Sequence, residues 1–240
     1  MKPILSLIQL NIERDEHFDR VIPFLLERMP DVVCVQEVCK KDVPFLEKAL
    51  GMECFYVPMA RQVYKGLPHV FGVAIFSKLR VSSREAKYYH GSPEHIPTFV
   101  APNQDTVNHA LAYCDVAKEN LVFRIGTTHF TWAPDGEVDN LQRRDLPNLL
   151  KVLKEAGEIV FTGDFNAPRG KEVFNEIASR YKDNVPAKYT DSLDDTFHRR
   201  KDLELMVDGI FSTPSYKVSD VEMICDVSDH CALTAKVSKK

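Results

Sequence analysis

The sequence lacks the features that mark a membrane, secreted or low-complexity protein. No apolar run approaches the roughly 20 residues that are needed to cross a bilayer. The N-terminal residues 1–8 contain no long apolar stretch followed by a small-residue cleavage site. Internal repeats and linkers are also absent from the sequence. We therefore expect a cytoplasmic protein without a transmembrane segment.

Motifs that pair cysteines are missing as well. The six cysteines have neither a CxxC spacing nor the dense spacing of a disulfide framework, and several lie inside apolar runs. They are Cys34, Cys39, Cys54, Cys114, Cys225 and Cys231. This pattern favours buried free thiols and a reduced protein.

The chain also has no strong excess of charge of one sign. It contains 31 Lys and Arg residues against 35 Asp and Glu residues, which gives a net charge of -4. No global positive field therefore indicates nucleic acid as the partner. With 44% hydrophobic residues among 240, the chain can bury a real core in one large domain. We expect a single domain over residues 1–240.

Apolar periodicity predicts many strands and few helices. Residues 4–12 alternate like a strand, residues 16–29 repeat at helical spacing, and residues 31–35 form the continuous apolar run of a strand buried on both faces. Further strands are expected at 53–58, 71–77, 80–89, 109–117, 121–130, 158–163, 206–211, 217–224 and 231–237, helices at 42–50, 138–154 and 170–180, and a surface loop at 90–107. Because strands and helices do not alternate strictly, the pattern indicates two packed mixed sheets with helices on their outer faces.

Glu37 stands at the end of a buried strand. An ionised carboxylate is costly there unless a cation or hydrogen-bond donors compensate it. Magnesium favours oxygen ligands and keeps several waters, so one or two carboxylates with an amide are enough to bind it. The alternative is that Glu37 caps the next segment or pairs with Lys40 or Lys41.

Asp164 and Asn166 follow another buried strand. Because they are two residues apart, both point to one face of an extended chain while Phe165 packs on the other. Such a pair can orient a water molecule, take its proton and hold a phosphate oxygen. A simple Asx turn is the alternative.

Acids and imidazoles also stand in or beside three other strands. His129 ends one strand, and Asp229 and His230 precede the last strand, where both reach one centre only if the backbone bends. Asp208 interrupts an apolar strand and needs a partner, for which His129 or His230 is a natural candidate. The alternative partners are the basic residues Arg199, Arg200 and Lys201.

Taken in order, these segments resemble the endonuclease/exonuclease/phosphatase superfamily, the group with the pancreatic deoxyribonuclease-like fold. The resemblance covers nearly the whole chain. It rests on Gln9-Leu10-Asn11, Val35-Gln36-Glu37-Val38, Gly72-Val73-Ala74-Ile75-Phe76-Ser77, Thr128-His129, Gly163-Asp164-Phe165-Asn166, Val207-Asp208-Gly209-Ile210-Phe211 and Ser228-Asp229-His230. It implies an α+β fold, a four-layered α/β/β/α sandwich of two mixed β-sheets flanked by helices, with the site at the loop end where the sheets meet.

The resemblance also implies a metal site. Glu37 would be the main ligand of Mg²⁺ or Mn²⁺, with Asn11 and Asp229 beside it, and Gln36 would support Glu37.

By the same resemblance, five residues carry the reaction. Asp164 would activate water, Asn166 would bind a non-bridging phosphate oxygen, and His230 would stabilise charge on the phosphorus. His129 would contact phosphate or donate a proton, and Asp208 would orient one of the two histidines.

The sequence departs from the family pattern at two points. Gly209 stands where relatives have an aromatic residue, which predicts a small gap near the scissile group. The tyrosine and arginine that clamp phosphate in many nucleases of the family have no clear counterpart. The candidates are Tyr64, Tyr113, Arg61 and Arg143.

The combined reading is a metal-dependent phosphoesterase that uses attack by water without a covalent enzyme intermediate. A nuclease or DNA-repair-type phosphodiesterase acting on DNA or RNA is one interpretation, and the basic stretch 61–87 would then contact the nucleic-acid backbone. The alternatives are a hydrolase of small phosphoesters or lipid head groups, such as inositol phosphates or sphingomyelin, and a catalytically silent binding module. No protein partner follows from the sequence.

Overall fold

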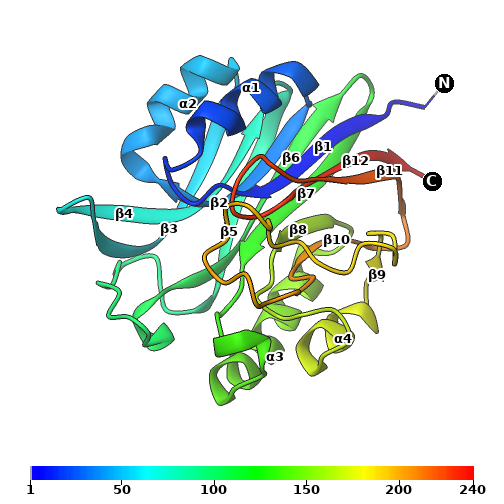
Figure 1. Ribbon diagram of the computed structural model, residues 1–240. Helices are drawn as coiled ribbons and strands as arrows, with labels where there is room; N and C mark the ends of the chain where they lie inside the picture. Colours follow the sequence, from blue (N-terminus) through cyan, green and yellow to red (C-terminus); the bar gives the residue numbers. More distant parts are fainter. Residues whose placement is uncertain (1) are drawn as a thin grey trace.

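The computed structural model describes residues 2–240 and arranges them in four layers (Figure 1). Two six-stranded sheets form the middle layers. Helices α1 (Phe18–Arg28) and α2 (Val43–Leu50) lie outside one sheet, and α3 (Asn140–Ala156) and α4 (Glu172–Ala178) lie outside the other. No helix in this part of the chain combines the length and the apolar character that crossing a membrane requires. The expected four-layered sandwich is confirmed.

Each sheet is mixed, and the strand order follows from the connections. The first sheet has the order β11 (Tyr216–Ile224), β12 (Ala232–Lys239), β1 (Leu5–Asn11), β2 (Val32–Cys39), β4 (Leu67–Ser77) and β3 (Glu53–Tyr64). The second has the order β5 (Arg80–His90), β6 (His109–Lys118), β7 (Leu121–His129), β8 (Val160–Asp164), β10 (Asp208–Ser212) and β9 (Lys182–Asp183). The described chain also contains three short 3-10 helices, which are η1 (Lys40–Asp42), η2 (Gln104–Thr106) and η3 (Pro134–Gly136).

One pair of neighbouring strands in each sheet is parallel. These pairs are β1 with β2, where Asn11 lies opposite Gln36, and β7 with β8, where His129 lies opposite Asp164. Because parallel strands run in the same direction, their carboxyl ends meet at one edge of the sheet. The polar residues that follow both pairs are thereby collected at strand ends.

Three apolar clusters fill the three spaces between the four layers. The cluster between the sheets includes Leu5, Val73 and Ile125. Residues of α1 and α2 cover the outer face of the first sheet, and residues of α3 and α4 cover that of the second. Burial on both faces explains why the central strands are continuous apolar runs in the sequence.

The elements predicted from the sequence are present, with small differences in their bounds. β3 and β4 extend beyond the predicted ranges because they form a hairpin around Lys65 and Gly66. The short strand β9 was not predicted, since two residues carry no periodicity. The predicted surface loop 90–107 contains the turn η2 and isolated bridges.

The expectation that all six cysteines are free thiols is wrong for two of them. Cys225 and Cys231 form a disulfide, because the turn between β11 and β12 brings their Cα atoms within 4.2 Å. The remaining four are free, and three of these are buried.

The gap predicted at Gly209 is also absent. A Cβ atom at this position would lie 2.8 Å from the ring of Phe211 and 3.1 Å from the ring of Phe165. Asp208 faces the other sheet, so the next residue along the strand faces α3 and α4. The aromatic rings of that outer cluster fill the space.

The absence of a side chain at Gly163 allows β7 and β8 to pair closely. A Cβ atom here would lie 2.1 Å from the carbonyl oxygen of Thr128. We expect Gly163→Ala to lower the free energy of unfolding by about 3 kcal/mol, because backbone has to move. The control is Gly51→Ala, whose new Cβ meets nothing within 4 Å and whose cost is backbone strain alone at φ 62°, about 1 kcal/mol. Urea denaturation measures both; equal losses would contradict the close approach.

Candidate active site

The pleat of β1 explains why Asn11 faces the space between the sheets. Successive side chains alternate between the two faces of a strand. Leu5 and Leu7 pack between the sheets, whereas Ile8 packs under α1 and α2. Gln9 and Asn11 continue the inward row of Leu5 and Leu7. The row changes from apolar to polar where the strand reaches the edge of the sheet.

The second sheet follows the same rule. On β7, Ile125 belongs to the cluster between the sheets and His129 continues its row. On β8, Val160 belongs to that cluster and Asp164 continues the row. Asp208 begins β10 directly opposite Asp164. Inward rows from both sheets therefore end in acids, amides and an imidazole.

Glu37 is brought to this edge by an irregularity in β2. Because Gln36 lies inward beside Asn11, simple alternation would turn Glu37 outward. The register of β2 against β4 shifts between Val35 and Val38, and Glu37 has a left-handed φ of 58°. Bulges of this kind re-aim a side chain. As a result Glu37 lines the cavity between the sheets, and its Oε1 atom lies 3.4 Å from Nδ2 of Asn11.

A cavity of about 500 Å³ opens at this edge. The residues named from the sequence that line it are Glu37, His129, Asp164, Asn166, Asp229 and His230. Asn11 joins them through hydrogen bonds, and Asp208 lies behind His230. The structure brings all eight candidate residues into one site.

Asp164 is the centre of the hydrogen-bond network. Its Oδ1 atom accepts from the backbone N–H of Asn166 at 2.8 Å, and its Oδ2 atom accepts from Nδ2 of Asn11 at 3.2 Å. Nε2 of His129 lies 3.4 Å and Nε2 of His230 lies 3.8 Å from Oδ2. Burial opposes ionisation, but the charge of His230 and the hydrogen bond from His129 outweigh it and hold the pKa of Asp164 below its usual range.

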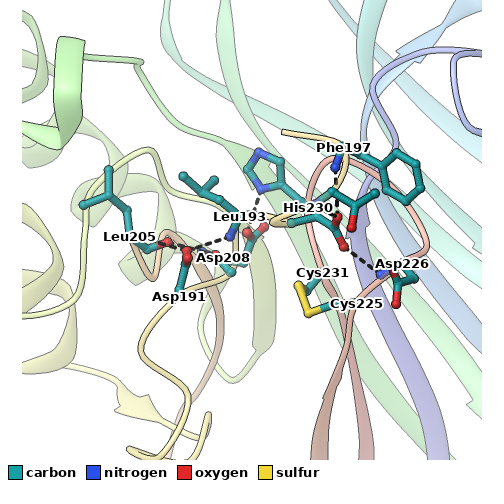
Figure 2. The surroundings of a disulfide bond; sticks show 12 residues. Asp191, Leu193, Phe197, Leu205, Asp208, Cys225, Asp226, His230 and Cys231 are labelled. Carbon is teal, nitrogen blue, oxygen red and sulfur yellow. Dashed lines mark hydrogen bonds and ion pairs between the residues drawn. A yellow bond between two sulfur atoms is a disulfide. The ribbon is translucent and has the colours of Figure 1, made fainter. Parts of the chain in front are cut away.

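His230 is the histidine that Asp208 orients, which decides the pairing that the sequence left open. Its Nδ1 atom donates to Oδ2 of Asp208 at 2.7 Å, as Figure 2 shows. Asp208 is fully buried, and its other oxygen accepts from Nε2 of Gln9 at 2.8 Å. Burial lowers the pKa of His230, but Asp208 and then Asp164 outweigh burial and raise this pKa well above the usual value. At neutral pH this imidazole is charged.

His129 lies beside the same carboxylate, Asp164. Burial lowers its pKa, but the hydrogen bond to Asp164 and the charge of that carboxylate raise it above the usual value. Its backbone carbonyl accepts from Nδ1 of His109 at 2.9 Å, which fixes the end of β7.

A buried amide network links the two sheets behind these groups. Nε2 of Gln9 donates to Oε1 of Gln36 at 2.9 Å, and Nε2 of Gln36 donates to Oγ1 of Thr127 at 2.8 Å. Gln36 thus supports the site because its hydrogen bond to Thr127 joins the two sheets directly behind it.

Asn166 forms the Asx turn that was the alternative, so the chain is not extended at this residue as expected. Its N–H closes an Asx turn on Asp164, and its residue conformation is left-handed with φ 48°. Nδ2 donates to the carbonyl of Phe130 at 2.9 Å, which leaves one amide hydrogen available to the cavity. The carbonyl of Asn166 accepts from Nε2 of Gln142 at 2.9 Å, so α3 holds this turn in place.

Asp229 and His230 reach the same cavity because the chain bends before β12. Residues 225–231 form a turn closed by the disulfide (Figure 2). Oδ2 of Asp194 accepts from the backbone N–H of Asp226 at 2.6 Å, and the N–H of Asp194 donates to the carbonyl of Asp229 at 2.8 Å. These contacts hold the turn from the opposite loop.

Carboxylate oxygens of the kind that divalent cations favour as ligands face this cavity. Glu37 and Asp229 both line the cavity and offer oxygen ligands. Burial, with the charges of Glu37 and Glu13, raises the pKa of Asp229 to about 6, although His230 lowers it. A cation beside these acids would offset their repulsion. Asn11 turns its amide nitrogen toward Glu37, and its oxygen accepts from the N–H of Glu13 at 3.2 Å.

The alternative that Glu37 pairs with Lys40 or Lys41 is wrong. Its partner is Arg14, whose Nη2 atom lies 3.3 Å from Oε2 of Glu37. Lys41 instead pairs with Asp15 at 3.5 Å. Arg199 and Arg200 do not pair with Asp208 either, because their partners lie elsewhere.

Sequence reasoning missed several side chains that line the cavity. Among residues 2–240 these include Arg14, His109, Trp132, His198, Arg199 and Arg200. Two weak signals were present in the sequence. Arg14 follows the Asn11 motif closely, and Trp132, which follows His129, is the single tryptophan of the chain.

The four phosphate-clamp candidates do not line this cavity. Tyr64 donates to Asp15, and Tyr113 donates to Glu85 at 2.7 Å. Arg143 forms an exposed ion pair with Glu172. The N–H of Arg61 donates to the carbonyl of Pro97 at 2.7 Å. The arginines that line the cavity are Arg14, Arg199 and Arg200.

The Asp208–His230 pair predicts a measurable pKa change. We expect Asp208→Asn to lower the pKa of His230, because the largest favourable charge is removed, while His129 keeps its contact with Asp164. Titration of the imidazole resonances by NMR, assigned with His230→Gln, measures both. An unchanged pKa at His230 would contradict the pairing.

The same pair gives a pH dependence of stability. A raised folded-state pKa adds stability that is fully present below the unfolded value of about 6.5 and is lost as pH rises through the folded value. The loss of unfolding free energy in Asp208→Asn is therefore expected to be larger below this window than above it.

The comparisons with known proteins agree with the geometry. A model of the Endonuclease/Exonuclease/phosphatase family matches residues 8–230. No curated protein matches the chain. Many solved structures do.

An endonuclease/exonuclease/phosphatase from Bacteroides vulgatus is 21% identical over 100% of both chains, with a TM-score of 0.76. The human Nocturnin catalytic domain with a bound sulfate anion is 18% identical over 99% of this chain and 94% of that chain, with a TM-score of 0.75. A mannosyl-6-phosphatase from Bacteroides thetaiotaomicron is 13% identical over 97% of this chain and 99% of that chain, with a TM-score of 0.71. These likenesses show the shared fold. Because the family model spans nearly the whole sequence, the chain belongs to the Endonuclease/Exonuclease/phosphatase family.

Proposed function

We propose that this protein is a divalent-metal-dependent phosphoesterase that hydrolyses its substrate by direct attack of water. The observation that supports the proposal is the convergence of strand-end acids, amides and imidazoles from both sheets on one cavity. Family membership supports the reaction class, since members are hydrolases that act on phosphoester bonds.

Glu37 and Asp229 are the residues that would hold Mg²⁺ or Mn²⁺, and Asn11 would lie beside them. When bound, the ion would supply charge stabilisation to a phosphoryl oxygen and to the leaving alkoxide. The repulsion between these partly buried carboxylates supports this assignment.

Asp164 is the group that would accept a hydrogen from the attacking water. It is ionised and therefore acts only as an acceptor. Asn11 and the N–H of Asn166 fix its two oxygens at one orientation. A carboxylate held this way positions a water molecule for in-line attack.

The imidazoles would meet the charge that develops on the phosphate. His230 is held in the charged form by Asp208, and its Nε2 atom faces Asp164 at 3.8 Å. A charged donor aimed at the phosphoryl oxygens stabilises the transition state without reorganising. His129, whose pKa Asp164 raises, would contact the phosphate or protonate the leaving group. Asn166 would use its free amide hydrogen on a non-bridging oxygen.

The lining of the cavity supports attack by water over a covalent intermediate. Within residues 2–240, its lining includes no serine, threonine or cysteine. The usual hydroxyl and thiol nucleophiles of hydrolases are therefore not offered to the substrate there.

For the substrate, a phosphodiester of DNA or RNA is the first candidate, as in a nuclease or DNA-repair-type phosphodiesterase. The supporting observation is that Arg14, Arg199 and Arg200 line the cavity together with the half-exposed ring of Trp132. Arginine forks bind phosphate, and exposed aromatic rings stack on bases.

A small phosphoester or lipid head group is the second candidate. The basic stretch 61–87 supports it, because three of its six lysines and arginines form ion pairs with acids. Lys65 pairs with Asp15, Arg84 pairs with Glu53, and Lys87 pairs with Glu85. A polynucleotide therefore gains little from this stretch, which has the character of a solvated surface.

Activity assays on a generic aryl phosphodiester test the proposed reaction. We expect Glu37→Ala and His230→Ala each to lower turnover by about a thousandfold or more, because each removes charge stabilisation at the reacting phosphate. Glu172→Ala, an exposed site on α4, is the matched control and should retain activity. Thermal melting checks that each variant folds. Unchanged rates in both site variants, or no hydrolysis by the native protein with Mg²⁺ or Mn²⁺, would contradict the proposal.

A substrate panel separates the two candidates. It contains abasic duplex, single-stranded DNA, RNA, 5'-tyrosyl DNA, inositol phosphates and sphingomyelin. A preference for a polynucleotide that weakens as salt rises supports the first candidate. A preference for inositol phosphates or sphingomyelin supports the second.

A further inference from the structure

Arg14 occupies a strained position directly after β1. Glu13 and Arg14 both have left-handed backbone conformations, with φ 41° and 66°. Each such residue costs about 1–2 kcal/mol when it is not glycine. Strain of this kind persists where the surrounding structure imposes it, and it concentrates at functional sites. Here the N–H of Glu13 donates to Oδ1 of Asn11 at 3.2 Å, so the turn is tied to the site.

The guanidinium of Arg14 lies beside two aromatic rings, and one of them, Phe71, lines the cavity. Its central carbon is 5.2 Å from the ring centre of Tyr64 and 5.6 Å from that of Phe71. The side chain is only 16% exposed. Rings on the flank of a guanidinium restrain its stem while leaving the planar edge of donors open.

The N–H donors of Arg14 have few acceptors within the described chain. Nη2 has one contact, at 3.3 Å to Oε2 of Glu37, and Nη1 lies 3.8 Å from Oε1 of Glu13. Nε is buried, and no atom of residues 2–240 accepts a hydrogen bond from it. A guanidinium carries five N–H donors in a fork that matches a phosphate. Arg14 therefore has spare donors beside the cavity that contains Asp164 and His230.

Glu37 belongs both to the proposed metal site and to the ion pair with Arg14. It is the principal carboxylate of the proposed metal site, and within the described chain Arg14 is its ion-pair partner. A divalent cation at Glu37 would face the guanidinium across a short distance and be repelled by it. An anion bound to Arg14 would remove this repulsion.

We propose that Arg14 is an anion-binding residue that couples phosphate binding to metal binding. This inference rests on the proposed function. While the cavity holds no phosphate, Arg14 pairs with Glu37 and weakens the binding of a cation there. When phosphate is present, Arg14 forks onto its oxygens and releases Glu37. Phosphate and divalent cation then enter the site together, and each raises the affinity of the other by the same factor.

Calorimetric titration of the full chain with Mn²⁺, with and without inorganic phosphate, tests the coupling directly. For the native protein we expect phosphate to tighten Mn²⁺ binding about tenfold, within the usual range of coupling between sites. For Arg14→Gln we expect tighter Mn²⁺ binding than in the native protein without phosphate, and little further gain when phosphate is added. Arg28→Gln, an exposed arginine on α1 that pairs with Glu222, should behave like the native protein.

A second variant keeps the test decisive if Arg14→Gln does not fold. Arg14→Lys retains the charge but loses the fork. It should keep the weak Mn²⁺ binding without phosphate and lose much of the gain that phosphate brings. In hydrolysis assays Arg14→Lys should raise KM more than it lowers kcat, since the residue acts on phosphate binding.

The outcomes distinguish this inference from the proposed function. If native protein binds Mn²⁺ and hydrolyses a phosphodiester, but both Arg14 variants show the native response to phosphate, the coupling is overturned and the phosphoesterase stands. If native protein neither binds Mn²⁺ nor hydrolyses phosphoesters, both fail.

Discussion

The pleat of the central strands places the reactive side chains, and the remaining features of the site depend on it. In each sheet the inward rows begin as apolar contacts between the sheets and end in polar groups at the same edge. Asn11 ends such a row on β1, His129 on β7 and Asp164 on β8. The parallel pairing of β1 with β2 and of β7 with β8 brings these ends together. A one-residue slip in any of these strands would turn its polar residue outward and dismantle the site.

Burial makes charge balance the second constraint. Asp164 and Asp208 lie almost entirely out of contact with solvent, and each is stabilised by hydrogen-bond donors and by His230. Burial and the charges of Glu37 and Glu13 raise the pKa of Asp229, although His230 lowers it. The negative charges of Asp164 and Asp208 are therefore balanced where water would be activated. Positive charge is lacking where Glu37 and Asp229 would hold a cation. Arg14 supplies part of this charge at Glu37.

The sequence predicted what depends on local pattern, and missed what depends on distances between segments. Strand ends with polar residues are visible as apolar runs followed by acids or amides, so the layered fold and the site members follow from pattern and family resemblance. The choice of His230 as the partner of Asp208 requires the pairing of β10 with β8. The bulge that turns Glu37 inward has no signature in residue type. The disulfide and the position of Arg14 likewise depend on how loops meet after folding.

We propose that one divalent cation binds between the two sheets at Glu37 and Asp229. Anomalous diffraction from crystals of the protein soaked in Mn²⁺ tests this claim directly, because the signal locates the ion without reference to activity. We expect a single strong anomalous peak in the cavity, within coordination distance of the carboxylates of Glu37 and Asp229. A cavity without a peak, or an ion bound only at other acids such as Glu13, would contradict it.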